Sequence, residues 1–185
     1  MNERLGPIAA DQMSQAQRAA AQAVIDGPRG ALYGPFVPLL RSPELMEHAQ
    51  RMGEYLRYRS ALGPRLSELA ILITARHWDQ AVEWAIHAPI ATASGVKAEL
   101  VASIGRRARP SGMAFDESAV YDFCSELHQQ RKVGEASYAA ALALLGEQGV
   151  LDLTGICGYY SLLAMVMNVA HTAVPASAAA ALPDC

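Results

Sequence analysis

The segment RHWDQAVEWAIH, residues 76–87, holds the first residue types that could do chemistry, Glu83 and His87. The two are four positions apart, so on a helix they share one face, about 6 Å apart along the axis. A carboxylate beside an imidazole suits general acid–base work, because it fixes the imidazole tautomer and raises its basicity. The alternative is an ordinary surface pair of the same spacing.

Glu68 is the second candidate, because it lies in the segment PRLSELAILITAR, which is otherwise too apolar to accept a charge. A buried carboxylate without a partner costs several kcal/mol or becomes protonated. Glu68 therefore faces solvent or enters a polar pocket. If helices 65–77 and 79–94 fold back on each other, Glu68 approaches Glu83 and His87.

A metal ion is the other use of two carboxylates and one histidine. Only Glu83 and His87 have the spacing of helical metal ligands, so no metal site is predicted. Cysteine does not supply one either, because Cys124, Cys157 and Cys185 are isolated and no CxxC is present. The same spacing excludes a disulfide framework.

Several other residues are candidate substrate contacts, each with a structural alternative. Arg76 could clamp a carboxylate, or it could be a cation at a helix C-terminus. Tyr33 and Phe36 are interpreted as a pocket lid or a loop anchor. Tyr159 and Tyr160 could line the pocket or pack in the core with a hydrogen-bonded tip. The histidines expected on helix surfaces are His48, His128 and His171.

The elements that must position these residues are all predicted to be helices, because alternating strand patterns are absent. Helix 65–77 is apolar on nearly every face and is expected to be buried on all sides. Segment 27–38, rich in Gly and Pro, is expected to be an irregular loop, and Pro89 is expected to kink its helix just past His87. Predicted helices cover 14–26, 42–60, 65–77, 79–94, 97–107, 116–132, 135–145 and 150–170.

Composition limits the class of protein. The chain has 185 residues, 52% apolar and 18% charged, with a net charge of −3. These values exclude disorder, predict one domain over 1–185, and argue against nucleic acid as a partner. The longest apolar runs fall short of the roughly 18 residues of a membrane span. The start of the chain has no apolar signal core, and the cysteines suit a reducing compartment, so a cytoplasmic location is expected.

From about residue 35 to 168 the chain resembles the carboxymuconolactone decarboxylase family, part of the alkylhydroperoxidase D-like superfamily. The resemblance rests on RSPELMEHAQRMGEYLR, LSELAILITARHWDQAVEWAIHAPIA, AVYDFCSEL and SYAAALALLGEQGVLDLTGICGYYSLLAMVMN. It implies a single-domain, all-α bundle of seven or eight helices that assembles as a trimer or hexamer.

The resemblance also assigns site positions. In the peroxidase branch a glutamate precedes a CxxC on the next helix, and a histidine follows four residues after the second cysteine. Glu68 and His87 match the glutamate and the histidine, whereas Gln80 and Glu83 occupy the cysteine positions. Without that dithiol no peroxidase cycle is implied, and Cys124 and Cys157, on other helices, cannot replace it by motif.

The leading hypothesis is therefore a cofactor-free acid–base enzyme, similar to carboxymuconolactone decarboxylases, that acts on a small carboxylic acid or lactone. His87 would donate the proton to the substrate. Glu83 would orient the His87 imidazole or act as an alternate acid–base group, and Glu68 would relay the proton. The same residues could serve a hydrolase or an isomerase. A non-catalytic ligand-binding or assembly protein on the same scaffold is the rival hypothesis. Neither a membrane nor a nucleic acid is an expected partner.

Overall fold

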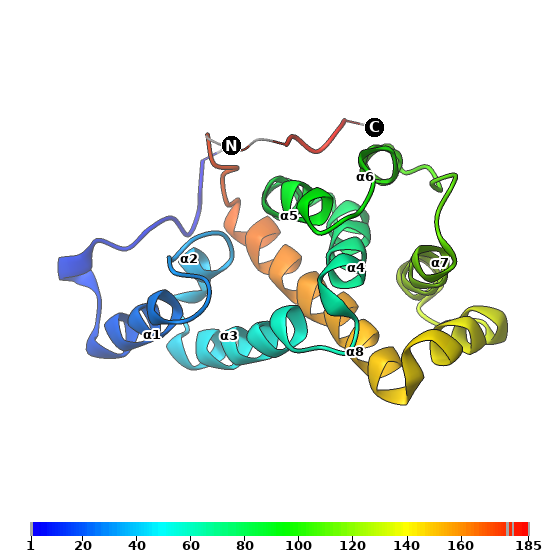
Figure 1. Cartoon of the computed structure of the whole chain (residues 1–185). Helices are drawn as coiled ribbons and strands as arrows, with labels where there is room; N and C mark the ends of the chain where they lie inside the picture. The colour runs from blue at the N-terminus through cyan, green and yellow to red at the C-terminus, as the bar shows by residue number, and fades with distance from the viewer. Residues whose placement is uncertain (1, 177, 179, 185) are drawn as a thin grey trace.

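The computed structural model describes residues 2–176, 178 and 180–184, so Cys185 lies outside the described residues. The described residues are all-helical, with a short 3-10 helix (Ala10–Gln12) before eight α-helices and no strand. Figure 1 shows their arrangement. Their bounds are α1 Gln15–Asp26, α2 Phe36–Leu39, α3 Pro43–Tyr58, α4 Gly63–His77, α5 Ala81–Ala93, α6 Ala98–Gly105, α7 Phe115–Gln130 and α8 Glu135–Ala170.

Helix α4 is the centre of the fold, and it packs against α3, α5, α6, α7 and α8 (Figure 1). Every residue from Leu66 to Arg76 is buried, as its all-round apolar sequence predicts. Pro64 in its first turn has the fixed backbone angle that a helix start requires, and it removes a backbone N–H that would have no partner there. The helix hairpin α4–α5 therefore forms the wall on which a buried polar site must be built.

Helix α8 consists of two helical stretches that meet at Gly146, where the backbone is non-helical (φ 67°, ψ 178°). The sequence predicts the same division, into 135–145 and 150–170. By length and composition alone α8 could cross a membrane. However, 56% of its most apolar stretch is buried inside the protein, which is also typical of a core helix.

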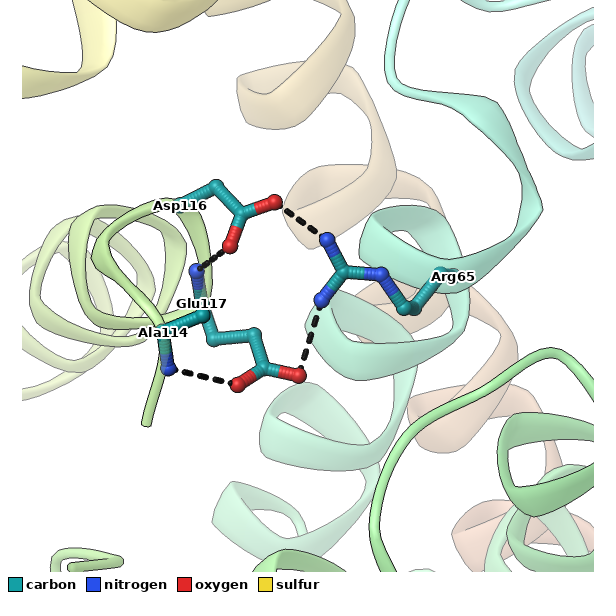
Figure 2. Close-up of polar contacts among 4 residues, drawn as sticks. All are labelled: Arg65, Ala114, Asp116 and Glu117. Atoms are coloured by element: carbon teal, nitrogen blue, oxygen red, sulfur yellow. Dashed lines mark hydrogen bonds and ion pairs between the residues drawn. The ribbon is translucent and has the colours of Figure 1, made fainter. Parts of the chain in front are cut away.

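Helix α7 is held against the start of α4 by an arginine between two carboxylates (Figure 2). Arg65 donates to Glu117 at 2.8 Å and also pairs with Asp116. The other oxygen of Glu117 accepts the backbone N–H of Ala114, 2.8 Å away, at the N-terminus of α7. One charged cluster thus caps α7 and fixes its position on α4.

One detail of the predicted elements differs from the structure. Segment 27–38 is not irregular throughout, because α2 begins at Phe36 within it. Phe36 and Leu39 of α2 are buried in the core, so the short turn of helix is stabilised by packing rather than by sequence propensity. Ser14, in contrast, caps α1 as predicted, and its side chain accepts the backbone N–H of Gln17.

Substituting Gly146 tests the break in α8. A Cβ added there would meet no atom within 4 Å, so Gly146→Ala isolates the backbone strain of an L-residue at φ 67°, ψ 178°. We expect the free energy of unfolding to fall by about 1–3 kcal/mol. The matched control is Gly158→Ala, at an exposed helical position of α8 with equally free space, which should stabilise by about 0.5–1 kcal/mol. If urea unfolding showed the same change in the free energy of unfolding for both variants, the backbone at Gly146 would not be strained for an L-residue.

Candidate functional site

Packing of α5 against α4 brings Glu68, Glu83 and His87 together in the interior. Gln80 sets the start of α5, since its side chain accepts the Val82 backbone N–H at 2.7 Å. Glu83 and His87 then face α4 one turn apart. All three members of the site are at most 3% exposed, so this is a polar cluster in the core and not a surface pair.

The imidazole of His87 lies between the two carboxylates. Its Nδ1 is 2.7 Å from Glu68 Oε2, and its Nε2 is 3.3 Å from Glu83 Oε2. Both ring nitrogens donate when the ring is protonated, so the imidazolium form satisfies both carboxylates at once. We call this row of three side chains the Glu–His–Glu row.

Electrostatics keep the proton on His87. Burial alone lowers the pKa of an imidazole, but the charge and hydrogen bond of Glu68, together with those of Glu83, outweigh it. The pKa of His87 is raised from 6.5 to about 9. The row therefore holds a stored proton at neutral pH.

Two arginines that the sequence analysis does not single out complete the site. Arg57 of α3 lies with its Nε 3.4 Å from Glu68 Oε1. Arg29, in the segment between α1 and α2, stacks on the ring of Phe36, with 4.6 Å from its Cζ to the ring centroid. Its Nη1 is buried and has no hydrogen-bond partner among the described residues. Neither arginine has a helical spacing to Glu83 or His87, so no local pattern could have identified them.

A small space, the inner cavity, lies against the row. Its volume is about 20 Å³, and its walls include Arg29, Arg57, Glu83 and His87. Of the predicted substrate contacts, Tyr33, Phe36 and Tyr160 also line it, and the edge of Tyr160 packs on His87 with centroids 5.2 Å apart. A volume of this size accommodates about one water molecule.

A larger space, the outer pocket, lies on another side of the row. It measures about 270 Å³ and is lined by Arg57, Glu68, Tyr58, Ser60, Gly63, Pro64 and Ile90. Arg57 lines both spaces. Glu68 lines the outer pocket and is bonded to His87, which lines the inner cavity. The row thus connects the inner cavity to the outer pocket.

Tyr159 is not a wall of the inner cavity, although it was predicted as a candidate contact. It is fully buried next to Tyr160, and its hydroxyl has no partner among the described residues. Burial raises the pKa of Tyr159 to about 12. It lies against Gly53 of α3, where an added Cβ would overlap the Tyr159 hydroxyl and come within 2.6 Å of Arg29 Nη2.

Arg76 lies away from the Glu–His–Glu row, so the structure does not bring this predicted substrate contact together with the row. It sits in the last turn of α4 and donates to the carbonyl of Pro183 at 3.0 Å. A second nitrogen is 3.4 Å from Asp79. The reason is geometric, since eight residues of helix separate Arg76 from Glu68, about 12 Å along the axis. Its position fits the other interpretation given for Arg76, a cation at the C-terminus of a helix.

The two positions that the resemblance aligns with a dithiol carry polar side chains here. Gln80 donates to Asn168 at 2.7 Å besides capping α5, and Glu83 belongs to the row. Among the described residues, no group of three or more His, Cys, Asp or Glu side chains is arranged to hold a metal ion. In the row itself, one oxygen of each carboxylate faces a ring nitrogen of His87, which is the arrangement that stabilises a protonated imidazole.

No known protein family profile and no curated protein matches this chain. Solved structures do match. An uncharacterized peroxidase-related protein from Ralstonia eutropha JMP134, named as an alkylhydroperoxidase AhpD core, superposes with a TM-score of 0.74 at 16% identity. The match covers 94% of this chain and 93% of that one.

Two further structures show the same likeness. An uncharacterized peroxidase-related protein from Silicibacter sp. TM1040 has a TM-score of 0.74 at 13% identity, over 98% of this chain and 96% of that one. Protein ATU0492 of unknown function, a candidate antioxidant defence protein AhpD from Agrobacterium tumefaciens, has a TM-score of 0.67 at 12% identity. That match covers 75% of this chain and 96% of that one. At these identities the likeness establishes the fold alone, an all-helical AhpD-like fold, as the sequence resemblance implies.

The raised pKa of His87 makes stability depend on pH. The proton of His87 stabilises the folded state fully below about pH 6.5, its unfolded value, and this contribution disappears as the pH rises through about 9. The contribution is on the order of 3 kcal/mol. We expect the stability difference between wild type and His87→Gln to shrink by about that amount between pH 6 and pH 10. Urea unfolding at several pH values measures it.

The matched control is His48→Gln, which changes an exposed histidine on α3. The difference in the free energy of unfolding between His48→Gln and wild type should stay constant between pH 6 and pH 10. A difference for His87→Gln that is equally flat would show that the buried imidazole carries no extra proton.

Proposed function

We propose that this protein is a cofactor-free acid–base enzyme that moves a proton on a small monoanionic carboxylic acid or lactone. One observation carries the proposal. Glu83 lines the inner cavity, its Oε1 is buried without a partner among the described residues, and its other oxygen meets a protonated His87. An unpartnered buried acceptor beside a stored proton is costly for stability and useful for catalysis.

The geometry favours a different division of labour from the one expected from sequence. Both nitrogens of His87 are engaged by carboxylates, so His87 is not free to reach a substrate atom. Glu83 is the group that meets the substrate, taking a proton from carbon or delivering one. His87 supplies or receives that proton through Nε2, and Glu68 exchanges it with the outer pocket.

The charge of the site supports a monoanionic substrate. Arg57 and His87 are balanced by Glu68 and Glu83, which leaves the guanidinium of Arg29 without an acidic partner among the described residues. Arg29 is half-buried, with its Nη1 fully shielded from solvent, and a carboxylate is the planar anion that arginine binds best. We therefore assign the binding of the substrate carboxylate to Arg29 instead of Arg76.

Access to the inner cavity requires a movement, because about 20 Å³ does not admit an organic acid. Tyr33 and Phe36 line it. Two glycines with left-handed backbone angles flank Tyr33, Gly30 (φ 71°) before it and Gly34 (φ 57°) directly after it. The segment between α1 and α2 is the part of the wall without regular structure, so we assign it as the lid. A lid that also carries Arg29 would close on the carboxylate it binds.

The small cavity is also the observation that favours the rival, a ligand-binding or assembly protein on this scaffold. The two differ in what happens to the substrate carbon. An acid–base enzyme exchanges an acidic C–H with solvent, whereas a binding protein leaves it intact. A hydrolase or isomerase using the same residues would still show the Glu83 dependence.

Hydrogen exchange into a small keto acid tests the proposal without knowledge of the natural substrate. We expect the wild-type protein to accelerate the exchange of the acidic C–H hydrogens of levulinate for deuterium in D₂O. The exchange is measured as the loss of their proton NMR signals. Glu83→Gln should lower the rate by about 10²–10⁴-fold, and His87→Gln similarly. The double variant should be much less than additive, since both changes disable one proton path.

Substrate charge gives a second prediction. We expect Arg29→Gln to remove the preference for levulinate over its neutral methyl ester, mainly through KM, because the guanidinium binds the carboxylate. The control is Arg51→Gln, an exposed arginine on α3 whose loss should change neither rate. Exchange catalysed equally well by Glu83→Gln would remove Glu83 from the chemistry, and binding without exchange would favour the rival function.

A further inference from the structure

Two cysteines that lie 33 residues apart in sequence meet in the core. Cys124 of α7 and Cys157 of α8 are both buried and unbridged, and their sulfurs are 3.5 Å apart. The expectation that these cysteines are isolated is therefore wrong, because packing of α7 on α8 places them side by side. A disulfide requires the sulfurs to approach from 3.5 Å to about 2 Å.

A histidine stands beside this pair. His128 Nε2 is 2.9 Å from the hydroxyl of Thr74, and Thr74 donates its only hydroxyl hydrogen to the carbonyl of Ala70 at 2.9 Å. The Thr74 oxygen must then accept from His128, so Nε2 of His128 carries a hydrogen. His128 is half-buried and stacks on His77, with centroids 4.6 Å apart. It is not the surface residue that the sequence suggests.

The two sulfurs have different chemical environments. Hydrogen bonding to Cys124, with a further contribution from His128, lowers the pKa of Cys157 to about 6 despite its burial. Burial raises the pKa of Cys124. A thiolate next to a thiol, with a proton donor adjacent, is the arrangement in which one sulfur attacks and the other resolves.

A polar pocket of about 80 Å³ leads from the surface to this cluster. Its walls are Ile73, Arg76, His77, Ile104, Arg107, Tyr121, Ser125, His128 and Gln129. His128 is the wall residue that acts on Cys157, and Ser125 directly follows Cys124. A space of this size takes several water-sized molecules and no bulky one.

From this arrangement we propose that Cys124 and Cys157 form a redox site, separate from the Glu–His–Glu row, whose oxidant is hydrogen peroxide and whose product is a reversible disulfide between α7 and α8. The Cys157 thiolate attacks one peroxide oxygen. The S–O bond forms, the O–O bond breaks, and the departing hydroxide takes up the proton that the Cys157 thiol lost on ionisation and leaves as water. Sulfur loses two electrons and becomes a sulfenic acid.

The second step closes the bridge. The Cys124 sulfur attacks the Cys157 sulfur, the S–S bond forms and the S–O bond breaks. The hydroxide leaves as water with the proton of the Cys124 thiol. In total, two thiols and one hydrogen peroxide give one disulfide and two waters, and an external thiol reverses the change by exchange.

Intact-mass measurement on the folded, full-length protein tests the site. In a Cys185→Ser background the two core cysteines are the remaining ones, so bridge formation appears as loss of two hydrogen masses. We expect hydrogen peroxide to cause this loss, a thiol reductant to reverse it, and tert-butyl hydroperoxide to act at least tenfold more slowly. Oxidation of the exposed Met52 and Met165 shows in each sample that the peroxide dose was effective.

Single variants separate the roles of the two sulfurs. In Cys124→Ala, Cys157 should accumulate as a sulfenic acid that dimedone traps, whereas in Cys157→Ala the Cys124 thiol should stay unmodified. His128→Gln should slow bridge formation at least tenfold, and the exposed-residue control His48→Gln should not change it. Melting temperatures establish that each variant is folded.

Two outcomes would overturn the proposal. One is wild-type protein that keeps both thiols, titratable after denaturation, at a peroxide dose that oxidises Met52. The other is a bridge that forms only once the chain has been unfolded. Neither outcome bears on the Glu–His–Glu row, because levulinate exchange is measured independently of the thiols.

Discussion

The carboxylate of Glu68 is the constraint on which the rest of this fold depends. It stands on the central helix, 3% exposed, where an unpaired charge is strongly destabilising. Its two oxygens are satisfied from two other helices, by His87 of α5 and Arg57 of α3. The core can therefore form only when three helices are in register, so the most costly group in the interior also specifies how α3, α4 and α5 assemble.

The central helix carries two separate polar clusters. Near its beginning, Glu68 belongs to the Glu–His–Glu row, and towards its end, Thr74 bonds His128 close to the two buried sulfurs. The AhpD-like fold of the structural neighbours is shared, but Gln80 and Glu83 stand where the resemblance places a dithiol. In this chain the buried sulfurs lie on α7 and α8 instead, and the α4–α5 hairpin holds carboxylates.

Sequence predicts well what depends on local spacing. The turn-by-turn pairing of Glu83 with His87, the buried helix around Glu68 and the break at Gly146 all follow from periodicity or from a single residue type. What sequence could not predict depends on contacts between distant segments. Arg29 and Arg57 reach the row from outside the hairpin, and Cys124 meets Cys157 only because α7 packs on α8. Arg76 is the opposite case, since it is near the site in sequence but about 12 Å from Glu68 along the helix axis.

The absence of a side chain at Gly53 links parts of the chain that share no chemistry. Tyr159 and Arg29 occupy the space that any Cβ at that position would fill. A change at Gly53 therefore requires a smaller residue at position 159, a displaced arginine, or both. In an alignment of homologues these three positions should covary, with a larger residue on α3 accompanied by loss of the Tyr159 ring. Evolution of substrate preference in this fold would then proceed through paired substitutions, beginning at a residue that touches no substrate.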